Sequence, residues 1–95
     1  GAELMGAMVQ VRAAFVEELQ DTATCLSLTM DWHRTDKGKQ LQKFTAIVCK
    51  PAGERVEVVG KYPGDASPEW CARKMAKAFM SKESLEGVTL RVVNC

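Results

Sequence analysis

The chain has 95 residues, of which 46% are apolar and 26% are charged, the balance of an ordinary globular protein. Thirteen basic residues against twelve acidic ones give a formal net charge of +1, which excludes a strong overall attraction to nucleic acid or to an anionic membrane. No apolar run approaches the roughly 20 residues of a membrane span, so we expect no membrane association. One hydrophobic core serves a chain of this length, and we therefore expect a single domain over residues 8–95.

The first segment of the chain is ambiguous in two ways. Residues 1–7 read as the remnant of a tag or vector, ahead of a native start, and we leave them out of the fold. From Met8 onward, apolar Val11, Phe15 and Leu19 recur at helical spacing. The same stretch also alternates between apolar and polar residues, as a strand does. A length of about a dozen residues favours a helix over residues 8–19, with a strand as the alternative.

Three strands follow the first segment. Period-two alternation predicts strands over residues 24–33, 41–49 and 56–62. The connections at 34–39 and 51–54 are short and contain the Asp, Gly and Pro residues that favour turns. Short connections between successive strands predict an antiparallel meander.

The rest of the chain predicts a second helix and a last strand. Ser67, Pro68 and Glu69 form a helix start, because Ser can cap free amides, Pro fits the first helical position and Glu suits the positive end of the helix dipole. The helix is expected to run to Lys82, and residues 88–93 alternate as a strand. The predicted fold is α+β in the order α-β-β-β-α-β, with an antiparallel sheet of three or four strands and two helices packed on one face. The predicted core comprises Phe15, Leu19, Leu26, Leu28, Phe44, Val48, Val58, Met75, Phe79, Leu90 and Val92.

Catalytic and metal-binding motifs are not recognisable in the sequence. His33 is the single histidine, and the four cysteines include no closely spaced pair that would predict zinc. An even number of cysteines also permits disulfides, but we expect four reduced thiols in an intracellular, cytoplasmic protein, with Cys95 exposed. No nucleophile motif, phosphate-binding loop or paired carboxylate is present. We therefore expect no catalytic activity, no metal and no cofactor.

Basic residues gather in two segments, the first hairpin and the second helix. Lysines at a hairpin tip can simply be solvated and discourage edge pairing of the sheet. They can also form a basic surface that binds phosphates. On the second reading the candidate nucleic-acid-binding residues are Arg34, Lys37, Lys39, Lys43, Arg73, Lys74 and Lys77.

The predicted layout resembles the double-stranded RNA-binding domain. The resemblance covers about residues 11–82 and rests on Lys43-Phe-Thr-Ala-Ile-Val, on the stretch from Gly60 to Ser67, and on Ala72-Arg-Lys-Met-Ala-Lys77. The layout also resembles the small Alu-RNA-binding subunits of the signal recognition particle, which pair as dimers. The first resemblance implies RNA contacts at Glu18, at Lys37 and Lys39, and at the helix start after Ser67. There this chain has Pro68-Glu69-Trp70, whereas the family has a lysine pair, and it adds a terminal strand.

A protein-interaction or homodimerisation domain is the alternative function. The sheet face opposite the predicted core is more apolar than a solvated face requires, and a terminal edge strand could pair with another chain. Trp32 is expected in the core, whereas Trp70, at the first turn of a helix, is expected to be exposed. With few exposed aromatic residues, RNA binding should be directed at the backbone and weakly selective for sequence. The candidate partner-binding residues are Trp70, Ile47, Val59 and Val93.

Overall fold

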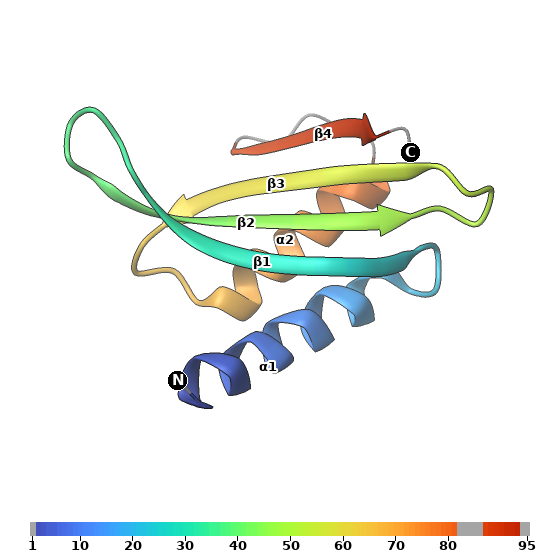
Figure 1. The fold of residues 1–95 in the computed structure, drawn as a ribbon, viewed down its shortest axis with the longest axis horizontal. Coiled ribbons are helices and arrows are strands. Elements are labelled where there is room, and N and C mark those ends of the chain that lie inside the picture. Colours follow the sequence, from blue (N-terminus) through green and yellow to red (C-terminus); the bar gives the residue numbers. More distant parts are fainter. Residues whose placement is uncertain (1, 82–86, 94–95) are drawn as a thin grey trace.

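A computed structural model describes residues 2–81 and 87–93 and has the predicted order α-β-β-β-α-β (Figure 1). The sheet order is β1-β2-β3-β4, and every neighbouring pair is antiparallel. This confirms the α+β fold and fixes the number of strands at four. Within the described ranges, neither helix combines the length and hydrophobicity needed to cross a bilayer. Lys82 and Cys95, both named in the sequence predictions, lie outside the described residues. The elements are α1 (Ala2–Leu19), β1 (Thr24–Arg34), β2 (Gln40–Cys49), β3 (Arg55–Pro63), α2 (Pro68–Ser81) and β4 (Val88–Val93).

The ambiguous first segment is a helix. α1 buries Val11, Phe15 and Leu19 against the rest of the core, as the helical spacing predicts. It also extends back to Ala2, through residues that we had left out of the fold. The helix ends where Gln20 and Asp21 adopt positive φ values of 51° and 59°, a left-handed conformation that stops α-helical hydrogen bonding.

A β-bulge in β1 overturns the predicted burial of Leu26. The register pairs Cys25 with Val48 and then Ser27 with Ile47, so Leu26 is the extra residue of the bulge. The bulge shifts the alternation by one residue. Cys25 therefore faces the core, and Leu26 is exposed. Leu28, opposite buried Ala46, lies on the core face as predicted and is half-buried against the core.

The outer strand β4 accounts for two further errors in the predicted core. Leu90 and Val92 lie opposite the buried Val58 and Val56, and so belong to the helix-covered face of the sheet. They are nevertheless 41% and 53% exposed. The reason is the position of α2, which lies mainly over β3 and reaches β4 only weakly. The remaining predicted core residues are buried: Phe15, Leu19, Phe44, Val48, Val58, Met75 and Phe79.

One buried polar side chain fixes the loop before α2. Gln42 lies on the core face of β2, and its Nε2 donates hydrogen bonds to the carbonyl oxygens of Pro63 at 3.0 Å and Ala66 at 2.8 Å. The sequence analysis did not single out this residue. These bonds hold the start of α2 near the end of the sheet where β2 begins and β3 finishes.

Candidate nucleic-acid interface

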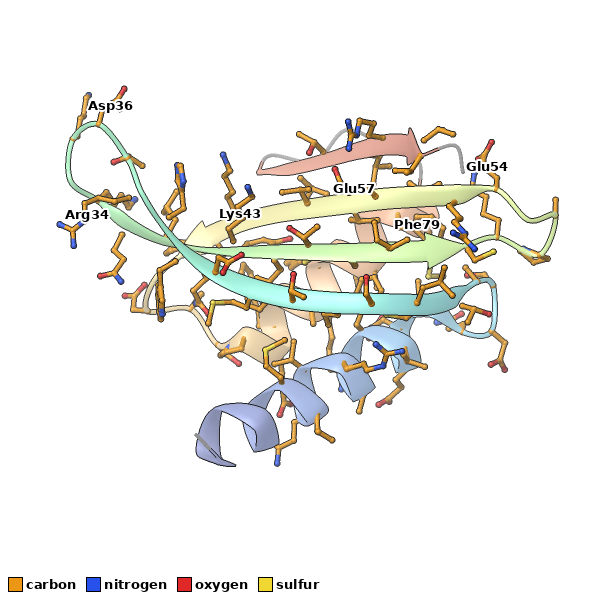
Figure 2. All side chains as sticks on the ribbon, viewed as in Figure 1. Arg34, Asp36, Lys43, Glu54, Glu57 and Phe79 are labelled. Atoms are coloured by element: carbon orange, nitrogen blue, oxygen red, sulfur yellow. The ribbon has the colours of Figure 1, made fainter. Side chains whose placement is uncertain are left out.

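The turn of the β1–β2 hairpin extends beyond the other strands at one end of the sheet (Figure 1). This turn is closed by a hydrogen bond from the Thr35 N–H to the Lys39 carbonyl oxygen at 2.9 Å, and Gly38 supplies a positive φ of 81°. Lys37 and Lys39 are exposed at this turn, as expected. Arg34 and Asp36 lie at the same end of the molecule (Figure 2).

Lys43 lies on the open face of the sheet, away from the helices. Its register partners are Asp31 on β1 and Lys61 on β3. Residues directly opposite one another share a face of the sheet. Lys61, which the sequence analysis did not select, therefore joins Lys43 on one surface.

Arg73 bridges the two helices. Its guanidinium lies 3.4 Å from a carboxylate oxygen of Glu18 and 3.5 Å from one of Glu17 (N–O distances). Two acidic side chains therefore compensate this cation. The structure thus brings together two residues predicted to contact RNA, Arg73 and Glu18, but as an ion pair that joins α1 to α2.

Lys39, from the β1–β2 hairpin, and Lys74, from α2, line the same pocket. The sequence of neither segment alone indicates this pocket. The pocket has a volume of about 680 Å³ and lies where β3 runs past the beginning of β4. We call it the lysine–tryptophan pocket, and its lining includes Lys39, Lys61, Lys74, Tyr62 and Trp70, together with the apolar Leu41 and Val88. Lys77, by contrast, is exposed on α2 and does not line it.

Two aromatic rings form the wall of this pocket nearest α2. Trp70 is 48% exposed, and its ring meets that of Tyr62 edge to face, with centroids 5.8 Å apart and planes at 77°. Nζ of Lys74 lies 5.3 Å from the centroid of the Trp70 ring, a cation–π distance. Tyr62 is buried, and burial raises the pKa of its phenol well above the ordinary value. Its hydroxyl has no hydrogen-bond partner among the described residues.

Trp32 is not a core residue, contrary to expectation. It lies opposite Gln42 on the helix side of the sheet, but it is 55% exposed because β1 is an outer strand. The exposed aromatic residues are therefore the two tryptophans, while the three phenylalanines and Tyr62 are buried. Both tryptophans present about half of their surface, and Trp70 does so as predicted.

The candidate protein-binding residues do not form one patch. Ile47, Val59 and Val93 are half-buried on the open face of the sheet. An ion pair of 3.4 Å between Glu57 and Arg91 crosses the same face, next to Ile47. Trp70 lies on α2, behind the sheet.

The described part of the chain contains no cluster of metal ligands and no disulfide. No group of three His, Cys, Asp or Glu side chains there could hold a metal ion. Cys25, Cys49 and Cys71 are free thiols. Burial raises the pKa of Cys71 to about 11, and it also raises that of Cys25, which makes both thiolates harder to form.

Lys61 and Tyr62 are the pocket residues that sequence reasoning missed. Lys61 is a single lysine in a strand, and it lines the same pocket as Lys39 and Lys74 because β4 begins only at Val88 and, in the described part of the chain, leaves the end of β3 uncovered. Comparisons of the chain with protein-family models, with curated proteins and with solved structures find no match.

Proposed function

We propose that this domain is a non-catalytic module that binds RNA inside the cell, through the lysines of the β1–β2 hairpin and of α2. The observation that supports this function is the convergence of Lys39, Lys61 and Lys74 on one pocket. Three ammonium groups from separate segments create a local positive potential that the net charge of +1 conceals. Phosphates of an RNA backbone are the polyanion that such a surface attracts.

The distribution of ion pairs supports the same surface. Away from this end of the molecule, Lys50 pairs with Glu54 at 3.0 Å, and Arg91 pairs with Glu57 at 3.4 Å. Arg73 is compensated by two glutamates. Among the described residues, none of the three pocket lysines forms an ion pair. Their charge is therefore available to phosphates without first breaking an ion pair, although Lys74 also lies over the Trp70 ring.

A titration against duplex RNA tests the proposal. Fluorescence anisotropy with a duplex of about 16 base pairs, the span typical of RNA-binding domains of this layout, should show binding at low salt. The affinity should fall with added salt. A plot of the logarithm of the association constant against the logarithm of the salt concentration should fall with a slope of about 0.9 for each phosphate contacted. Changing Lys37 and Lys39 to Glu should lower the affinity about tenfold or more at low salt, because both residues lie in an exposed turn.

The matched control is the variant Lys50→Glu/Arg55→Glu. It makes the same change in net charge at the other end of the sheet, where Figure 2 shows Glu54, the partner of Lys50. An exposed pair of this kind contributes little to stability, so the control should fold. Equal loss of affinity in both double variants would indicate a nonspecific charge effect. No binding at low salt would reject the RNA-binding function.

Homodimerisation through β4 is the second candidate function. The specific observation is the exposure of Leu90 and Val92 on an outer strand, beside Phe79. Exposed apolar side chains on an unpaired strand edge favour pairing with another strand. Sedimentation velocity over a range of protein concentrations should then show a dimer that Val92→Lys converts to a monomer. A monomer at all concentrations would reject this candidate.

A further inference from the structure

The lysine–tryptophan pocket results from a mismatch in strand length. β4 begins with Val88 opposite Gly60, and the hydrogen bond from Lys61 N–H to the Gly87 carbonyl oxygen, at 2.8 Å, is the last between these segments. β3 continues to Pro63, as Figure 1 shows. The strand edge at Tyr62 and Pro63 therefore has no partner strand among the described residues, and both residues line the pocket. A volume of about 680 Å³ lies within the range of small-molecule sites.

The chemistry of the lining combines a flat aromatic surface with positive charge. Trp70 offers a half-exposed indole whose orientation is held by the edge-to-face contact with buried Tyr62. Lys74 already places its ammonium group over that ring, and Lys39 and Lys61 line the pocket from the strands, Lys61 from the open face of the sheet. No acidic side chain lines the pocket in the described part of the chain. A ligand that uses the whole pocket has a planar π system and at least one phosphate.

We propose that this pocket receives a single unpaired nucleotide of the RNA, with its base stacked on Trp70 and its phosphate held by Lys39, Lys61 and Lys74. The inference rests on the proposed RNA-binding function and adds to it the recognition of an unpaired base. A stacked base takes the place of the Lys74 ammonium over the ring, and that ammonium then pairs with the phosphate of the same nucleotide. Lysine can follow this movement because it is a point charge on a flexible stem. Stacking of a base on an aromatic side chain contributes about 1–3 kcal/mol.

The test compares three RNAs that share one 16-base-pair duplex, the length used above. The first is blunt, the second carries a one-nucleotide overhang at each 3′ end, and the third carries an abasic residue with its phosphate at the same positions. The overhang should tighten binding about 5- to 100-fold relative to the blunt duplex, and the abasic overhang should lose most of that gain. The same set with 5′ overhangs covers the opposite polarity. In a Trp32→Phe background Trp70 is the only tryptophan, so quenching of its fluorescence by the overhang reports stacking directly.

Two variants separate the pocket from the rest of the RNA surface. Trp70→Leu should bind the overhang and blunt duplexes with similar affinity, and so lose the preference for the overhang. Since Trp70 contacts buried Tyr62, a second pair of variants guards against a folding defect: Lys74→Gln should reduce the overhang preference, whereas Lys77→Gln, on the same helix but outside the pocket, should not. Blunt and overhang duplexes of either polarity that bind equally would overturn this inference and leave the proposed function standing. An abasic overhang as good as the complete nucleotide would also overturn it. Failure of every RNA to bind would overturn both.

Discussion

Gln42 joins the middle of the sheet to the loop before α2, with its Nε2 donating a hydrogen bond to the carbonyl oxygen of Ala66 at 2.8 Å. A second bond reaches the carbonyl oxygen of Pro63 at 3.0 Å. Two backbone bonds also hold the loop, one from the Gly64 N–H to the Gln40 carbonyl oxygen at 3.2 Å and one from the Ala66 N–H to the Pro63 carbonyl oxygen at 3.0 Å, and Ala66 packs against the core. This buried amide therefore ties the loop before α2 to the sheet, while α2 itself is held by its buried side chains and by the ion pairs of Arg73.

Replacing this amide should destabilise the protein. In Gln42→Leu the carbonyl oxygens of Pro63 and Ala66 lose the donor of two partly buried hydrogen bonds, and the free energy of unfolding should fall by about 1–3 kcal/mol. Urea denaturation measures this change. Gln40→Leu is the control, because Gln40 is exposed at the start of the same strand and should change stability by less than about 0.5 kcal/mol. Equal effects of the two substitutions would show that the buried hydrogen bonds contribute nothing.

Gly60 should not tolerate a side chain. A Cβ atom there would lie 2.6 Å from Cε2 of Tyr62 and 2.7 Å from Cγ of Met75, both much closer than van der Waals contact. Gly60→Ala should therefore lower the free energy of unfolding by about 1–3 kcal/mol. Removing the phenol ring relieves one of the two clashes, so the double variant Gly60→Ala/Tyr62→Leu should be more stable than the sum of the single effects predicts. Additive losses in urea denaturation would contradict this explanation.

Stability should fall in alkaline solution because of Cys71. A thiol in the unfolded chain has a pKa of about 8.5, whereas burial raises the pKa of Cys71 in the folded protein to about 11. Between these values the unfolded state releases a proton that the folded state retains, so rising pH favours unfolding. The contribution is fully present below about pH 8 and is lost as the pH rises toward 11. Its slope approaches about 1.4 kcal/mol for each pH unit.

Urea denaturation between pH 7 and pH 10.5 measures this effect, and Cys71→Ala identifies its source. The variant should lose less stability than the parent between pH 9 and pH 10.5. Tyr62, whose phenol pKa is also raised by burial, should still cause a loss that begins above about pH 10 in both proteins. Parallel pH profiles for parent and variant throughout this range would rule out Cys71 as the alkaline-sensitive group.

The sequence by itself determined the elements and their order, because those depend on local signals. Ser67, Pro68 and Glu69 mark the start of α2 through capping and backbone geometry, and α2 begins at Pro68. The alternation of Phe44, Ala46 and Val48 with their neighbours predicted which face of β2 is buried, and all three are buried. Short turns between three strands left an antiparallel meander as the simple arrangement. In these cases the residues that carry the signal lie within one element or one turn.

Tertiary structure alone decided what depends on how elements overlap. Because of the bulge after Cys25, Cys25 faces the core and Leu26 does not. No pattern within β1 distinguishes that register from a regular strand. Exposure of Trp32 follows from the edge position of β1, because a side chain on the core face is buried only where a helix covers it. The candidate site has the same origin. Lys39, Lys61 and Lys74 become neighbours through strand register, the early end of β4 and the placement of α2, and these are contacts between residues far apart in the chain.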